Sequence, residues 1–145
     1  MWIAEGFTAY YDNLFVRRAG FYSPDQYLGM LASGLSTVAN QPGSLEQSAH
    51  EASFDAWIKQ YRPNENSRNS SISYYDKGSI IAMLMDLEIL QATSGQKKLD
   101  DVMNTMYYQY YYKLARGYTD AEFKDMAGKI AGKSMEAFYN DYVYG

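Results

Sequence analysis

Residues 75–93 read YDKGSIIAMLMDLEILQAT, and this stretch decides the fold that the sequence predicts. Its apolar side chains cover most of the circumference of a helix. They are Ile80, Ile81, Leu84, Leu87, Ile89 and Leu90. A helix that is apolar on several sides is buried on several sides, so we expect the other segments to pack around it. Gly95 follows as a residue that commonly ends a helix.

The segments on both sides of this stretch also carry helix signals and no strand signals. Ser23-Pro24-Asp25-Gln26 and Thr119-Asp120-Ala121-Glu122 are typical helix starts, with a capping serine or threonine three residues before glutamine or glutamate. Further helices are expected over residues 3–18, 44–51, 54–61 and 99–114 and after Ser134, and residues 62–71 are expected to form an exposed polar loop. The sequence therefore predicts an all-α fold of six to seven helices in a single domain, 1–145.

The composition excludes several classes of site. The chain has no cysteine and one histidine, His50, so it forms no disulfide and cannot complete a zinc site alone. His50 lies among polar residues, and we expect it at the surface. Acidic residues outnumber basic ones, 17 to 13, which argues against a nucleic-acid partner. No apolar run approaches the ~20 residues that span a membrane.

Two short segments contain residue types that serve catalysis. Glu5 stands beside Gly6 in an expected first turn, and a helical glycine suggests that another element packs closely there. Tyr74 and Tyr75 stand where the polar loop enters the buried helix, a position from which a phenol can donate a hydrogen bond into a cleft. From the residues alone, a capping glutamate and two packing tyrosines explain these segments as well.

Taken together and in order, the segments resemble the glycyl aminopeptidase family of gluzincin, thermolysin-like zinc metallopeptidases. The similar stretches are Trp2-Ile3-Ala4-Glu5-Gly6-Phe7-Thr8-Ala9-Tyr10-Tyr11-Asp12, Ser53-Phe54-Asp55-Ala56-Trp57-Ile58-Lys59, Tyr61-Arg62-Pro63, Glu65-Asn66-Ser67, Ser73-Tyr74-Tyr75-Asp76-Lys77-Gly78 and Tyr142-Val143-Tyr144-Gly145. The resemblance implies the helical C-terminal lobe of such a catalytic domain, and an aminopeptidase that releases small N-terminal residues such as glycine or alanine from peptide substrates.

The resemblance also assigns roles to individual residues. Glu5 corresponds to the third zinc ligand, and Tyr75 to the tyrosine that stabilises the tetrahedral intermediate, with Tyr74 as the alternative. Asp76 and Lys77 match the motif and are interpreted as structural first-turn residues. The H-E-x-x-H segment that supplies two histidine ligands and the general base is absent. We therefore expect a fragment of a larger catalytic domain that is inactive alone, with zinc bound in the complete parent enzyme and none bound by this chain.

A second hypothesis is a stand-alone, non-catalytic helical module that binds protein through its apolar and tyrosine-rich faces. The tyrosine cluster at residues 107–112 is expected to pack inside the domain, or to form a platform for carbohydrate or peptide. Without the upstream part, an apolar patch near Phe7, Tyr10 and Tyr11 is expected to favour self-association. The compartment stays open, with the bacterial cell envelope and the cytoplasm both compatible with the sequence.

Overall fold

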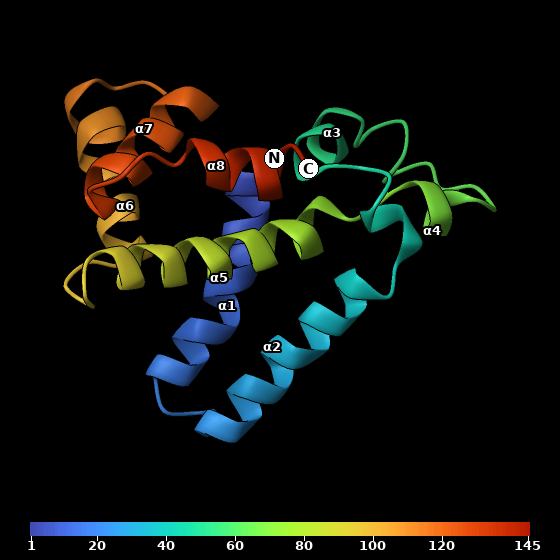
Figure 1. The fold of residues 1–145 in the computed structure, drawn as a ribbon, viewed down its shortest axis with the longest axis horizontal. Helices are drawn as coiled ribbons and strands as arrows, with labels where there is room; N and C mark the ends of the chain where they lie inside the picture. The colour runs from blue at the N-terminus through green and yellow to red at the C-terminus, as the bar shows by residue number, and fades with distance from the viewer. The chain divides into compact units, whose positions relative to one another are not determined.

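The computed structural model describes residues 1–145, and it is helical throughout with no strand, which confirms the all-α prediction (Figure 1). The α-helices are α1 (Phe7–Arg18), α2 (Pro24–Ala39), α3 (Ala49–Phe54), α4 (Ser67–Ser70), α5 (Tyr74–Ala92), α6 (Leu99–Met106), α7 (Asp120–Ala131) and α8 (Glu136–Phe138). The π-helical segments are η1 (Trp2–Gly6), η3 (Tyr107–Lys113) and η4 (Tyr139–Val143), and η2 (Pro42–Ser44) is a 3₁₀ turn.

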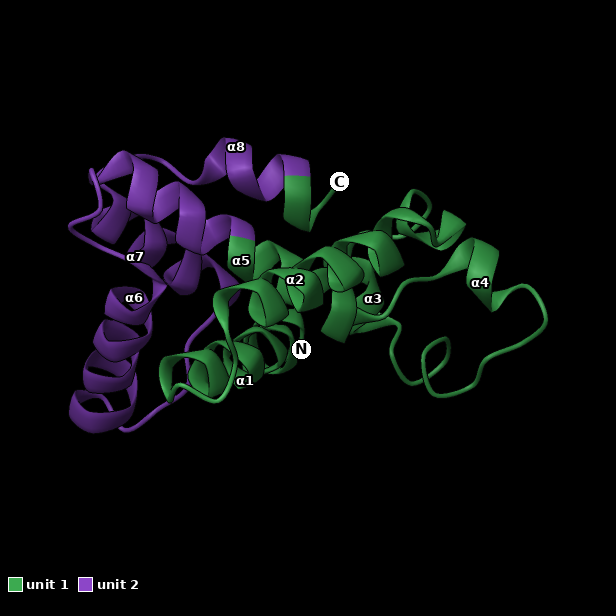
Figure 2. Cartoon of the chain, turned by 90° about the horizontal axis from the view of Figure 1, so that it is seen from below, with its two compact units in different colours: residues 1–83, 142–145 green, residues 84–141 purple.

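The chain forms two compact units, which Figure 2 shows in different colours. Unit 1 comprises Met1–Met83 and Tyr142–Gly145, and unit 2 comprises Leu84–Asp141. Helix α5 supplies its first half to unit 1 and its second half to unit 2. None of the helices combines the length and the apolar character that crossing a membrane requires.

In unit 1, two glycines let the start of the chain lie directly against α5. A Cβ atom built on Gly6 would lie 2.6 Å from both the Cα and the carbonyl carbon of Gly78. A Cβ atom on Gly78 would lie 2.8 Å from the carbonyl oxygen of Trp2. The close packing that Gly6 suggests in the sequence is therefore present, and the element it packs against is the first half of α5.

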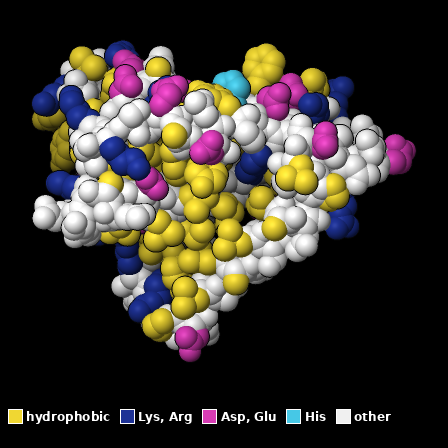
Figure 3. All heavy atoms as spheres, in the orientation of Figure 1, with side chains coloured by type: hydrophobic (Ala, Val, Ile, Leu, Met, Phe, Trp, Pro, Cys, Tyr) yellow, Lys and Arg dark blue, Asp and Glu magenta, His cyan; other side chains and the backbone are white.

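Helix α2 lies at the surface of unit 1. The predicted capping box is present: the Ser23 hydroxyl accepts a hydrogen bond from the Gln26 backbone, and the Gln26 side chain accepts one from the Ser23 backbone. No residue of α2 is buried, and Leu28 is 59% exposed. Figure 3 shows hydrophobic side chains at the surface over α1 and α2 and around α3. In α1, Phe7 and Tyr10 are buried, so the predicted apolar patch does not include them.

The prediction for residues 44–61 is wrong in its boundaries. Ser48 and Glu51 form a capping box, and α3 begins at Ala49 rather than at residue 44. Gln47 is buried, and its side-chain oxygen accepts a hydrogen bond from the backbone of Ile72, 25 residues away. Because its side-chain oxygen is bound to the backbone of Ile72, Gln47 does not cap a helix near it in sequence. Turns rather than a helix follow α3.

Unit 2 has an apolar core and a buried acid. The fully buried side chains of this unit include Met85, Ile89, Leu99, Val102 and Phe123. Asp86 is also buried, and its carboxylate accepts a hydrogen bond of 2.7 Å from the backbone N–H of Leu99, the first residue of α6. A carboxylate at this place satisfies one unpaired donor of the helix and interacts favourably with its dipole.

The helix expected over residues 99–114 changes its form halfway. It is α-helical only through α6, and the tyrosines that follow form the π-helix η3. After it, Thr119 and Glu122 form the predicted capping box of α7, and Gly132 ends that helix at a φ of +70°. The glycine is suited to this left-handed conformation because it has no Cβ.

The contact between Gly6 and Gly78 predicts the effect of adding one methyl group. Gly6→Ala forces the two backbones apart, and we expect the free energy of unfolding to fall by about 1–3 kcal/mol. Gly29→Ala is the matched control, since Gly29 is also helical and has nothing within 4 Å of the added atom. That change should leave stability equal or raise it by up to ~1 kcal/mol. Urea unfolding followed by circular dichroism measures both, and equal stability of the two variants would contradict the prediction.

The Glu122 carboxylate predicts a pH dependence of stability. The hydrogen bonds from Arg116 lower its pKa from 4.5 to about 2, and the backbone hydrogen bond of Thr119 adds to this effect. Because the folded-state pKa is depressed, the contribution is complete above pH 4.5 and is lost as the pH falls toward about 2. The stability difference between wild type and Glu122→Gln should therefore shrink over that interval in urea titrations. A difference that does not change with pH would exclude this explanation.

Candidate functional site

The carboxylate of Glu5 stands on a turn that is anchored in the core of unit 1. Trp2 and Ile3 of η1 are 1% and 5% exposed, whereas Glu5 is partly exposed. The Trp2 ring packs edge-to-face on Phe7, with 5.8 Å between the ring centroids. π-Helical turns are rare and occur frequently at functional sites. The anchored turn therefore presents one carboxylate at the surface in a fixed position.

Ser53 fixes this turn to α3. Its hydroxyl accepts a hydrogen bond of 2.8 Å from the backbone N–H of Trp2 and donates one of 2.9 Å to the carbonyl of Ala49. The N–H of Trp2 belongs to the first turn of a helix, where it has no partner within the helix. No local sequence pattern predicts this contact, because Trp2 and Ser53 are 51 residues apart.

Tyr75 lies in the first turn of α5, the helix that packs against the turn that carries Glu5. The hydrogen bond with Tyr74 lowers the pKa of the Tyr75 phenol, but the interaction with Tyr61, burial and the negative charge of Glu5 outweigh it, so the net shift is upward. Tyr75 thus stays a neutral phenol, the form that donates a hydrogen bond. The two residues that the sequence selects as metal ligand and oxyanion donor thus lie on elements that pack against each other, Glu5 on η1 and Tyr75 in the first turn of α5.

Tyr74 occupies a different environment from Tyr75. Its side chain is fully buried, and its hydroxyl shares a hydrogen bond of 2.7 Å with the hydroxyl of Tyr61. Burial, followed by the hydrogen bonds with Tyr61 and Tyr75, raises the pKa of Tyr74. The rings of Tyr74 and Tyr75 stack with 4.6 Å between centroids. Of the two tyrosines, Tyr75 is the one with an exposed surface.

Lys77 has a structural role that its neighbours in sequence do not reveal. Its half-buried ammonium group donates hydrogen bonds to the carbonyls of Ser44, Gln47 and Gly145, at 3.0, 3.0 and 3.1 Å. Burial lowers the pKa of Lys77, and the negative charge of Glu51 opposes this shift. The side chain therefore ties the loop before α3 and the end of the chain to α5.

His50 lies at the surface, as predicted. Its ring is exposed and contacts the edge of Tyr144, with 5.5 Å between centroids. No three side chains of histidine, aspartate or glutamate come close enough together to hold a metal ion. Glu5 is therefore not joined by two further ligands from this chain.

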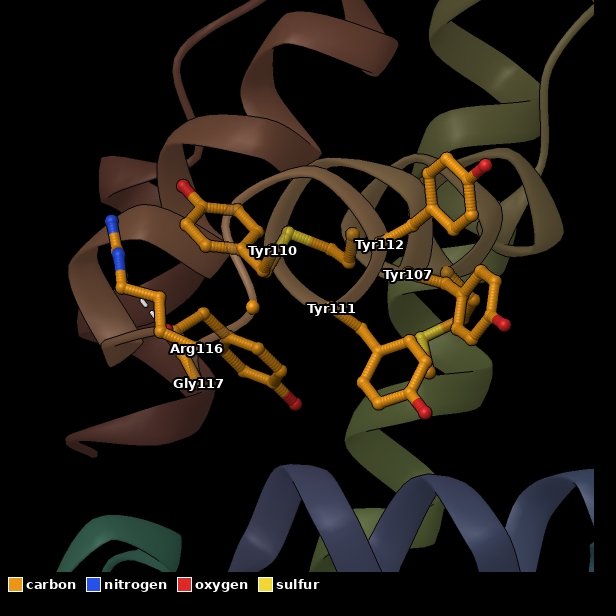
Figure 4. Close-up of a pocket in the computed structure, with 10 residues that line it drawn as sticks. Tyr107, Tyr110, Tyr111, Tyr112, Arg116 and Gly117 are labelled. Atoms are coloured by element: carbon orange, nitrogen blue, oxygen red, sulfur yellow. Dashed lines mark hydrogen bonds between the residues drawn. The ribbon is translucent and has the colours of Figure 1, made fainter.

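Unit 2 contains a pocket formed by the tyrosine cluster of η3 and the loop that follows (Figure 4). Its volume is about 810 Å³. It is lined by Met103, Met106, Tyr107, Tyr110, Tyr111, Tyr112, Ala115, Arg116, Gly117 and Tyr118. Figure 4 shows Tyr110 and Arg116 on the opposite side from Tyr107.

The only charged residue that lines this pocket is neutralised. The guanidinium group of Arg116 pairs with the Glu122 carboxylate at 2.6 Å and lies 5.0 Å from the centre of the Tyr110 ring. Several tyrosines of the cluster are largely exposed, among them Tyr111 at 67% and Tyr112 at 72%. The pocket thus offers aromatic faces and hydroxyl groups but no free acid or base, which suits binding rather than catalysis.

Comparisons with known proteins agree with the resemblance found in the sequence. No curated protein matches the chain. An aminopeptidase N family protein from Idiomarina loihiensis, known from its crystal structure, is 33% identical and superposes with a TM-score of 0.92. The match covers 99% of this chain and 24% of the other, so the chain spans about a quarter of that protein's length. Residues 1–81 match the M61 glycyl aminopeptidase family. The chain therefore belongs to the M61 glycyl aminopeptidase family.

Proposed function

We propose that this chain is part of a zinc-dependent aminopeptidase, in which Glu5 is a metal ligand and Tyr75 stabilises the oxyanion. The observation that supports the proposal most directly is the close packing of η1, which carries Glu5, against the first half of α5, which begins with Tyr74 and Tyr75. The two residues are 70 positions apart in the sequence. Membership of the family supplies the reaction class.

The chemistry of Glu5 fits a zinc ligand. A carboxylate oxygen is one of the three donor types that zinc accepts, and this carboxylate is partly exposed on an anchored turn. Zinc, when bound, supplies Lewis-acid polarisation of the scissile carbonyl. Because Glu5 belongs to no group of three possible ligands in this chain, the proposal places the two other ligands and the general base outside residues 1–145. We therefore expect the chain alone to bind zinc weakly and to hydrolyse nothing.

Tyr75 is suited to act when negative charge develops on the carbonyl oxygen of the substrate. A neutral phenol held at the end of a helix donates a hydrogen bond without first having to reorganise. Stacking on the buried Tyr74 ring restricts the rotation of the Tyr75 ring and so keeps the hydroxyl in place. The preference for N-terminal glycine or alanine is inferred from the family alone.

Two substitutions in the full-length protein that contains this chain separate the proposed roles. Glu5→Gln should lose bound zinc, measured by elemental analysis, together with the hydrolysis of glycine and alanine anilides.

Tyr75→Phe should keep its zinc and lower kcat by about 10²–10³, because it removes one oxyanion donor. KM should change little, since the hydrogen bond is made mainly in the transition state.

Tyr74→Phe is the control for the second substitution. It removes a hydroxyl that hydrogen-bonds with Tyr61 and Tyr75 but keeps the Tyr75 phenol, so it should reduce stability and change kcat only a few-fold. Full activity of Tyr75→Phe would exclude the proposed role of Tyr75, and stoichiometric zinc in Glu5→Gln would exclude that of Glu5. The absence of an H-E-x-x-H segment from the full-length protein would refute the zinc peptidase as a whole.

A second candidate function is the binding of a protein partner through the tyrosine pocket of unit 2. The observation that favours it is a pocket of about 810 Å³ lined by five tyrosines and two methionines, residue types that are enriched in interfaces. Its preferred ligand would be a large apolar side chain of the partner.

Replacing Tyr107 and Tyr111 by alanine tests this second function. The two rings stack on each other with 5.1 Å between centroids, and both are more than half exposed. We expect the double variant to keep its melting temperature and to lose partners recovered by cross-linking in cells. Peptidase activity of the full-length protein should not change. An unchanged set of partners would contradict this function.

A further inference from the structure

Two exposed aromatic rings lie in the turns that follow α3. Trp57 is 72% exposed and Tyr61 is 48% exposed, and their ring centroids are 5.2 Å apart at an interplanar angle of 36°. We call them the Trp57/Tyr61 surface. Phe54 and Ile58 beside it are 85% and 69% exposed. Large apolar side chains gathered at a surface commonly mark a binding site.

The backbone beneath the Trp57/Tyr61 surface is held in place. Ala56, between the exposed residues, is fully buried. Its carbonyl accepts a hydrogen bond of 3.0 Å from the N–H of Tyr61. The Asp55 carbonyl accepts hydrogen bonds from Ile58 and Lys59, and the side chains of Asp55 and Lys59 form an ion pair at 2.6 Å. A surface that is ordered before binding loses less entropy when a ligand binds.

Direct contacts connect this surface to the candidate site. The hydroxyl of Tyr61 shares a hydrogen bond of 2.7 Å with that of Tyr74. The Tyr74 ring stacks on Tyr75, and the first half of α5 packs against η1, the turn that carries Glu5. All these residues belong to unit 1. A peptide whose scissile carbonyl lies between Glu5 and Tyr75 therefore has an exposed aromatic surface within reach of one of its neighbouring side chains.

The chemistry of the surface selects the side chain. Indole and phenol faces attract apolar and aromatic groups, and the nearby charges of Asp55 and Lys59 neutralise each other. An N-terminal glycine or alanine has no side chain large enough to cover two aromatic rings. The family preference does not restrict the size of the side chain after the scissile bond.

We propose that the Trp57/Tyr61 surface binds the large apolar side chain of the second residue of a peptide substrate. The inference rests on the proposed function, because that function defines which residue comes second. It assigns a role in substrate specificity to Trp57, a residue that lies outside the segments that contain Glu5 and Tyr75.

Peptide binding to the 145-residue chain tests this inference without requiring activity. The chain has two tryptophans, so its NMR spectrum contains two indole N–H resonances, from exposed Trp57 and from buried Trp2. Addition of alanyl-phenylalanine amide should shift the Trp57 resonance saturably and leave that of Trp2 in place. Alanyl-glycine amide should leave both in place. Equal responses to the two dipeptides, or no response, would overturn the inference.

Variants show whether the rings of Trp57 and Tyr61 cause the preference for alanyl-phenylalanine amide over alanyl-glycine amide. Trp57→Ala should abolish this difference in affinity, which calorimetry measures. Tyr61→Phe, which keeps the ring and loses the hydroxyl, should retain it. Phe21→Ala is the matched control, because Phe21 is 81% exposed and lies in the turn between α1 and α2. A Trp57 resonance that shifts with protein concentration alone would show that a second copy covers the surface, and would also overturn the inference.

Kinetics of the full-length protein separate this inference from the proposed function. Trp57→Ala should raise KM for alanyl-phenylalanine amide about three- to tenfold and leave KM for alanyl-glycine amide and both kcat values unchanged. An active enzyme with an unchanged ratio of the two KM values would refute the inference alone. An inactive wild type whose Trp57 resonance still responds selectively would refute the proposed aminopeptidase and retain the aromatic binding surface.

Discussion

The contact between the backbones of Gly6 and Gly78 is the constraint on which the rest of unit 1 depends. Two helical segments approach so closely only where neither residue has a side chain, and here both residues are glycine. The contact sets the distance between η1 and the first turns of α5, and hence between Glu5 and Tyr75. The separation of the two candidate catalytic groups is thus fixed by residues that have no chemistry of their own.

Local signals predicted the parts of the fold that local interactions determine. The capping boxes at Ser23 and Thr119 and the glycine that follows α5, Gly95, were identified because each works within one turn. The start of α3 was placed too early, because Gln47 is engaged by the distant backbone of Ile72. The π-helical form of η3 was also not predicted, since π-helices are rare and the tyrosines that form this one continue the helix begun by α6.

The candidate site was predictable in part for the same reason. Motif resemblance selected Glu5 and Tyr75, which lie in recognisable short segments. Ser53 and Tyr61 act through hydrogen bonds to residues 51 and 13 positions away, and no sequence spacing reveals such partners. Lys77 was interpreted as a first-turn residue, and only the structure shows its ammonium group bound to three carbonyls. Side chains that join distant segments are recognised from coordinates rather than from patterns.

The π-helical turn that carries Glu5 has a consequence for how this site can change. A π-turn contains one residue more than an α-turn, so the chain before it is rotated by about 100° relative to an uninterrupted α-helix. Deleting a single residue between Trp2 and Gly6 would restore α-helical geometry and turn Trp2, the buried anchor of this segment, onto another face. During evolution, insertions and deletions in this short segment, more than substitutions, are therefore the changes that would keep the fold of unit 1 and displace the Glu5 carboxylate.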